Sequence, residues 1–143
     1  MTRYEHTQIG HVIIWSLLVL AVLCSIGGMF ESSPHRGPLS VASIVLLIML
    51  VLFYKLTVTI DDEALCASFG VGIIRKKVKI TQIAACEPIR IRWPSWGIHL
   101  TPYGLLYNVS GWDAVVIMLR NGRKFAVGTD DPHGLAAAIR SLI

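Results

Sequence analysis

The sequence predicts a membrane α-helical hairpin followed by a mostly-β domain, with about seven antiparallel strands in a sandwich or barrel and a C-terminal helix as its cap. Three observations lead to this prediction. Of the 143 residues, 54% are hydrophobic and only 15% are charged. Two long uncharged runs occupy the first 56 residues, and a period-two pattern punctuated by glycines begins at Thr57. This composition excludes intrinsic disorder and is poorer in charge than an ordinary soluble domain.

The first uncharged run extends from Ile9 to Phe30. A helix over this stretch is roughly 33 Å long and crosses a hydrocarbon core of about 30 Å. No Ala-x-Ala cleavage site follows the run, which argues against a cleaved signal peptide. Residues 9–30 therefore form the first predicted span.

The second run, from Leu39 to Tyr54, is shorter, but Leu56 extends its apolar surface and Lys55 can snorkel. The second predicted span covers 39–56, and residues 1–56 form the hairpin unit. Two prolines, a glycine and two serines in Glu31–Pro38 predict a tight polar turn between the spans. A hairpin buried in a soluble core is disfavoured, because the remaining chain is too small to surround two apolar helices.

Two spans leave both termini on one side of the membrane. Lys55 flanks the second span, and four more cations follow between Arg75 and Lys79. The connecting turn has Arg36 as its basic residue, accompanied by Glu31. The positive-inside rule therefore predicts a multi-pass protein with cytoplasmic termini.

Residues 57–143 alternate polar and apolar side chains in short segments bounded by turn residues, as strands do. The strands are predicted at 57–61, 64–69, 73–80, 89–93, 97–101, 113–119 and 124–129, with a loop between Thr101 and Asp113. Asn121-Gly122 predicts a type I′ hairpin turn. Asp131 as a cap, followed by Pro132, predicts the start of a helix over 131–143.

Three segments resemble the second half of small bacterial membrane proteins with a pleckstrin-homology-like (PH-like) domain. They are Gly97–Thr101, Gly104–Gly111 and Gly128–Pro132. The resemblance covers residues 57–143 and implies a PH-like domain at the bacterial inner membrane. It identifies no catalytic residue.

The most suggestive candidate site is a basic group. It contains Arg75, Lys76, Lys77, Lys79, Arg90 and Arg92. If the strands that carry them pair, several of these cations form one face, and each is worth about 1 kcal/mol of attraction to nearby anionic lipid. The alternative is a solvated strand surface that protects a sheet edge from aggregation.

Five aromatic residues form a second candidate group within twenty positions. They are Trp93, Trp96, Tyr103, Tyr107 and Trp112. Aromatic side chains of this kind insert into a membrane interface or line a peptide groove. The simpler interpretation, which we favour, is that they fill the core and cover an open end of the sandwich.

The sequence predicts no catalytic, metal or cofactor site. The five histidines are dispersed and have no metal-ligand spacing with Cys24, Cys66 or Cys86. Cys66 and Cys86 are expected to be buried thiols, and Asp130 and Asp131 are explained by helix capping. The small net charge of +4 and the membrane anchor argue against nucleic acid as a partner.

The expected function is therefore non-enzymatic. We expect the PH-like domain to contact a protein partner, a second copy of the chain, or anionic membrane lipid. The alternative is an accessory or assembly subunit of a larger membrane enzyme or transporter. An exposed strand edge offers a known way to add a partner strand.

Overall fold

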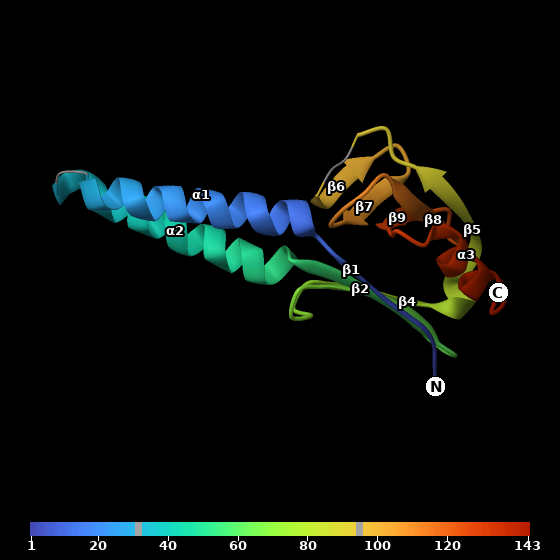
Figure 1. The fold of residues 1–143 in the computed structure, drawn as a ribbon. Coiled ribbons are helices and arrows are strands. Elements are labelled where there is room, and N and C mark those ends of the chain that lie inside the picture. Colours follow the sequence, from blue (N-terminus) through green and yellow to red (C-terminus); the bar gives the residue numbers. More distant parts are fainter. Residues whose placement is uncertain (31–32, 94–95) are drawn as a thin grey trace.

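The computed structural model describes residues 1–30, 33–93 and 96–143. A pair of long antiparallel helices extends from one end of a mixed α+β domain (Figure 1). Within the described residues there are three α-helices and two sheets, of four and five strands. In chain order the elements are β1 (Thr2–Ile9), α1 (His11–Phe30), α2 (Ser33–Phe53), β2 (Lys55–Asp61), β3 (Ala64–Phe69), β4 (Arg75–Lys79), a 3₁₀ turn (Ile80–Gln82), β5 (Ile83–Arg90), β6 (Gly97–Thr101), β7 (Gly104–Asn108), β8 (Asp113–Leu119), β9 (Lys124–Gly128) and α3 (Pro132–Arg140).

The N-terminal segment before the first helix is a strand, which the sequence reasoning did not predict. β1 is the edge strand of the four-stranded antiparallel sheet, whose order is β1-β2-β3-β4. It pairs with β2 from Thr2↔Asp61 to Ile9↔Lys55. The helical hairpin is therefore inserted between two paired neighbouring strands, and the backbone N–H of Gly10 donates to the carbonyl of Tyr54 at 2.9 Å where strands become helices.

The helix boundaries differ from the predicted spans. Lys55 and Leu56 begin β2 rather than end α2, because Leu56 alternates with Val58 and Ile60 on the buried face of that strand. In the predicted turn, Glu31 and Ser32 lie outside the described residues. The described part, from Ser33 to Pro38, is helical. Pro34 lies in the first turn of α2, where backbone N–H groups have no helical partner, whereas Pro38 lies inside the helix and forgoes one hydrogen bond.

The two long helices pack through small residues. Ser43 Oγ lies 2.8 Å from Ser25 Oγ and donates to the carbonyl of Ala21 at 3.1 Å. A Cβ added to Gly27 or Gly28 would lie 3.6–3.7 Å from Leu39, so the backbones approach closely. Away from this seam most side chains are exposed, as Trp15 (64%) and Leu23 (58%) are.

The five-stranded sheet has the order β5-β8-β9-β7-β6, and its β7–β9 pair is parallel. Among its described residues the domain thus has nine strands with one parallel pair, where seven antiparallel strands were expected. The predicted loop after Thr101 contains β7. The fourth strand comes earlier than predicted, at Ile83–Arg90, and tolerates Pro88 because β5 lies at an edge of the sheet.

The β8–β9 hairpin forms where Asn121-Gly122 predicted it, but its turn is not type I′. Gly122 has φ 84°, whereas Asn121 is outside the left-handed region that type I′ requires. The Gly122 N–H donates to Leu119 O at 2.9 Å, and the Leu119 N–H donates to Arg123 O at 2.8 Å. These bonds close a three-residue loop with a left-handed glycine.

The core lies between the two sheets and under α3. Its fully buried side chains include Leu56 and Phe69 from the four-stranded sheet, Val115 and Ile117 from β8, and Leu135 from α3. The predicted cap of α3 is confirmed, since the Gly134 N–H donates to the Asp131 carboxylate at 3.0 Å. The C-terminal helix packs against β5, β8 and β1.

Candidate functional site

The predicted basic group does not form one surface. β4 and β5 belong to different sheets, so their cations are carried on separate faces. Arg75, Lys77 and Lys79 are exposed on β4 and alternate with the buried Val78. Lys76 has the opposite parity, and its Nζ lies 6.0 Å from the centroid of the Phe125 ring.

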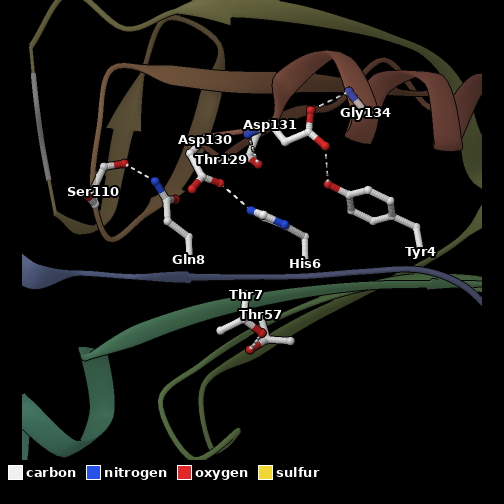
Figure 2. Close-up of polar contacts among 10 residues, drawn as sticks. All are labelled: Tyr4, His6, Thr7, Gln8, Thr57, Ser110, Thr129, Asp130, Asp131 and Gly134. Atoms are coloured by element: carbon white, nitrogen blue, oxygen red, sulfur yellow. Dashed lines mark hydrogen bonds and ion pairs between the residues drawn. The ribbon is translucent and has the colours of Figure 1, made fainter.

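The outward face of the four-stranded sheet carries polar side chains in register. One row across the sheet is Thr7, Thr57, Ser68 and Arg75, and the next is Glu5, Thr59, Cys66 and Lys77. Thr7 and Thr57 are hydrogen-bonded through their hydroxyls at 3.0 Å, as Figure 2 shows. This face, which we call the hydroxyl face, is polar and is basic along the β4 edge.

The turn between β3 and β4 folds back against the end of α2. Gly70 has φ 51°, and a Cβ there would collide with the carbonyl oxygens of Val51 and Leu52. Ile73 lines a shallow apolar groove together with side chains of α2, and it is 73% exposed, while Val71 is 60% exposed. The turn therefore presents two apolar side chains beside the helical hairpin, immediately before Arg75.

The other two predicted cations, Arg90 and Arg92, lie at a cavity of about 500 Å³ on the outward face of the five-stranded sheet. Its floor includes Leu106 of β7 and Ala126 of β9. Its walls come from both edges of the sheet, from β5 and the residues after it on one side and from β6 on the other. The sheet is therefore curled around this space, which we call the concave cavity.

The aromatic group is mostly at the surface, so the expectation that it fills the core is wrong for four of the five residues. Trp93 is 80% exposed, and Trp96, Tyr103 and Trp112 are 40–46% exposed. Trp93 and Tyr103 line the concave cavity. Tyr107 is buried between Phe69 and Phe125, and this burial raises the pKa of its phenol.

The inward face of β1 carries a row of polar side chains that the sequence reasoning missed. Figure 2 shows Tyr4, His6 and Gln8 pointing from one side of the strand toward the five-stranded sheet and α3. The Tyr4 hydroxyl donates to Asp131 at 3.4 Å, His6 pairs with Asp130, and the Gln8 amide donates to the carbonyl of Ser110 at 2.9 Å.

The environment of Tyr4 is the most perturbed in this row. Burial, reinforced by the Asp131 carboxylate, raises the pKa of Tyr4 to about 12. Asp131 thus serves both α3, as its cap, and β1, as an acceptor. Residues 2–9 have no apolar–polar alternation, so the sequence carries no period-two signal that could have identified this strand.

The described residues contain no group of three or more His, Cys, Asp or Glu side chains placed to hold a metal ion. Cys86 is buried as expected, with burial raising the pKa of its thiol and its Sγ 3.5 Å from the carbonyl of Ala136. Cys66, by contrast, is only half-buried, since it lies on the hydroxyl face. Asp130 pairs with His6 rather than capping the helix.

Among the described helices, α1 is long and apolar enough to cross a membrane, with a mean hydropathy of 2.5 and 6% of that stretch buried; the apolar part of α2, Gly37–Phe53, is shorter. Comparisons with protein-family models, curated proteins and solved structures found no match.

Proposed function

We propose that this chain is a non-enzymatic integral membrane protein whose helical hairpin spans the bilayer and holds the α+β domain against anionic lipid at the membrane surface. The length and the apolar surface of the helical hairpin support its role as a membrane anchor. At 1.5 Å per residue, α1 is roughly 30 Å long and the apolar part of α2 roughly 25 Å, near the thickness of a hydrocarbon core. The two helices expose far more contiguous apolar surface than a soluble protein keeps in water.

The position of the β3–β4 turn supports the contact with lipid, and it is the observation that carries the proposal. If α2 is embedded as far as Phe53, Val71 and Ile73 lie level with its last turns, because Gly70 abuts the carbonyls of Val51 and Leu52. Two exposed apolar side chains at this depth insert into the interface. Lys55 and Arg75 then lie at the level of the headgroups.

The cations of β4 contribute unequally in this arrangement. The strand runs away from the helices, and two residues of a strand advance about 7 Å. Lys77 is therefore about 7 Å and Lys79 about 13 Å farther from the surface than Arg75, while screening acts over about 8–10 Å in physiological salt. Arg75 supplies most of the attraction, on the order of 1 kcal/mol.

The charges also support the sidedness. Lys55 and the cations of β4 flank the domain end of the hairpin, whereas the sequence between the two apolar runs contains Arg36 as its basic residue, together with the acidic Glu31. The positive-inside rule places the domain and both termini in the cytoplasm, with the hairpin as a two-pass anchor of the bacterial inner membrane.

Membership of the PH-like family belongs to this proposal. Two facing sheets with a C-terminal helix packed across the core are compatible with it. The parallel β7–β9 pair and the β1 strand depart from the expected seven-strand pattern.

An accessory-subunit or assembly role is a second candidate, favoured by β6. This strand lies at the edge of its sheet, and its Leu100 is 84% exposed. Such an edge is able to accept a strand from a partner protein or a second copy.

Hydrogen exchange of the full chain in nanodiscs tests the lipid contact. Amides of residues 70–76 should exchange more slowly in anionic than in zwitterionic bilayers at low salt. Arg75→Gln should remove this difference, and the matched variant Lys79→Gln should retain it. Equal exchange in both bilayers would refute the contact. Release of the chain from membranes by alkaline carbonate would refute the anchor itself.

A further inference from the structure

The concave cavity is separate from the surface that the proposed function uses. It lies on the outward face of the five-stranded sheet, whereas Arg75 and the β3–β4 turn belong to the four-stranded sheet. We infer that this cavity binds a single-chain anionic amphiphile, with its apolar chain on the floor of the sheet and its carboxylate at Arg90 and Arg92.

The floor is suited to an apolar chain. Leu106 and Ala126 lie at its base and are each only 1% exposed, so the apolar surface that a bound chain would contact comes mainly from the half-buried Ile89 and Ile91. Ile89 and Ile91 pack against the same small apolar cluster and also line the cavity. The sheet face that would be solvated in an ordinary two-sheet sandwich is here an apolar surface enclosed by its own two edges, as ligand cavities in curled sheets are.

The charge at the rim selects an anion. Arg90 is the last residue of β5 and Arg92 follows it outside the strand, and both line the cavity together with Ile89 and Ile91. Among the described residues, neither guanidinium forms an ion pair with a carboxylate. A guanidinium presents a planar pair of donors that matches a carboxylate, and such charge-assisted bonds are the strongest hydrogen bonds available to a protein.

The size of the cavity favours one chain over two. A volume of about 500 Å³ is in the lower half of the range for small-molecule sites, about 300–1,000 Å³. A two-chain bilayer lipid would need much of its surface to remain outside. The exposed side chain of Trp93 stands at the wall, where it would cover a bound chain. The occupant is therefore a free amphiphile that enters from water rather than a lipid of the surrounding bilayer.

Calorimetric titration of the full chain in zwitterionic nanodiscs tests this inference, with octanoate as the probe and empty nanodiscs as the reference. We expect octanoate to bind at one site. The double variant Arg90→Gln/Arg92→Gln should weaken binding at least about tenfold, the usual effect of losing charge-assisted hydrogen bonds. The double variant Arg120→Gln/Arg123→Gln, which removes two exposed cations outside the cavity, should bind as the original chain does.

Two further probes separate the contribution of the ligand's alkyl chain from that of its carboxylate. Octanol should bind more weakly than octanoate and should be insensitive to Arg90→Gln/Arg92→Gln. Inorganic phosphate should bind far more weakly, because it has no chain for the floor. Ala126→Leu, which fills the floor, should abolish octanoate binding; the arginine variants, which alter the rim alone, keep the test decisive should that variant fail to fold.

Heat indistinguishable from empty nanodiscs, or phosphate binding as tightly as octanoate, would overturn the inference. Competition by anionic two-chain lipid added to the nanodiscs would overturn the assignment to a free amphiphile. A loss of lipid-dependent hydrogen exchange at residues 70–76 would leave this site untouched, because the two tests address different sheets.

Discussion

The two sheets share one core but treat their outward faces in opposite ways. On the four-stranded sheet, the outward positions carry hydroxyls, a half-buried thiol and cations, as Thr59, Cys66 and Lys77 show in one row. On the five-stranded sheet the corresponding positions carry Val116 and Ala126, which are almost fully buried. The outward face of the four-stranded sheet is in contact with solvent. The five-stranded sheet curls, so that its outward face forms a second apolar region. The side chains and the curvature of a sheet therefore decide whether its outward face is a solvated surface or the base of a cavity.

The sharpest test of this contrast places a carboxylate on each outward face. Val116→Asp should lower the free energy of unfolding by more than about 4 kcal/mol, because an unpaired charge would be buried. Thr59→Asp, on the hydroxyl face, should change it by less than about 0.5 kcal/mol. Urea unfolding of the full chain, followed by tryptophan fluorescence, measures both. Equal losses would show that the two faces are equally buried and would remove the contrast.

Two glycines provide the next test, one from a turn in each sheet. Gly70 and Gly104 have φ values of 51° and 90°, and at each a Cβ would collide with backbone carbonyl oxygen, of α2 for Gly70 and of Lys124 for Gly104. Alanine at either position should cost about 2–4 kcal/mol, from left-handed strain and steric overlap. Gly70→Ala should loosen the β3–β4 turn from α2, and Gly104→Ala should disturb the wall of the concave cavity.

Gly122→Ala is the matched control for both. Its φ is 84°, but a Cβ there meets no atom within 4 Å. It should therefore show the strain alone, about 1–2 kcal/mol. If all three variants lost the same stability, the close backbone contacts at Gly70 and Gly104 would be energetically unimportant.

A smaller effect is expected at Asp131, which joins the two sheets through β1 and α3. Asp131→Ala removes the cap of α3 and the acceptor of the Tyr4 hydroxyl, so it should cost about 1–2 kcal/mol. Asp130→Ala, at the neighbouring exposed carboxylate, should cost less than about 0.5 kcal/mol. Thermal unfolding of the two variants in parallel gives the comparison, and a larger loss at Asp130 would contradict it.

The smallest effect is a dependence on alkaline pH. The pKa of Tyr4 is about 12 in the folded chain, against about 10 for an unfolded tyrosine. The unfolded state therefore loses its proton first, and the stability contributed by neutral Tyr4 is present below pH 10 and is lost as the pH rises toward 12. Tyr4→Phe should reduce this loss of stability at alkaline pH but not remove it, because the pKa of Tyr107 is also raised. An unchanged slope would place the loss elsewhere.

Local patterns predicted much of this fold. The apolar first helix, the strands at Ala64–Phe69 and Asp113–Leu119, and the Asp131 cap are all as expected, because each depends on neighbouring residues. The missing strands, β1 and β7, depend on distant partners: β1 pairs with β2 across the whole hairpin, and β7 pairs in parallel with β9. Their own sequences are weakly patterned.

The candidate sites were less predictable for the same reason. Arg75 and Arg90 are close in sequence, so they were expected to share a face, but the chain changes sheets between them at the turn that ends with Gln82. The cavity at Arg90 depends on the approach of β5 and β6, the two opposite edges of one sheet. The spacing of residues along the sequence does not reveal that these two edges approach each other.

The joint between strands and helices has a mechanical consequence. On each arm of the hairpin a single residue, Gly10 or Tyr54, separates strand from helix, and the two are hydrogen-bonded to each other. No linker longer than one residue separates the helices from the strands at this joint, so the domain is not free to rotate on the hairpin. Any sliding or twisting of one helix against its neighbour is transmitted as shear between β1 and β2, and from β1 to the base of α3 through Tyr4 and Asp131. Force applied to the helical hairpin is therefore expected to reach the far end of the domain.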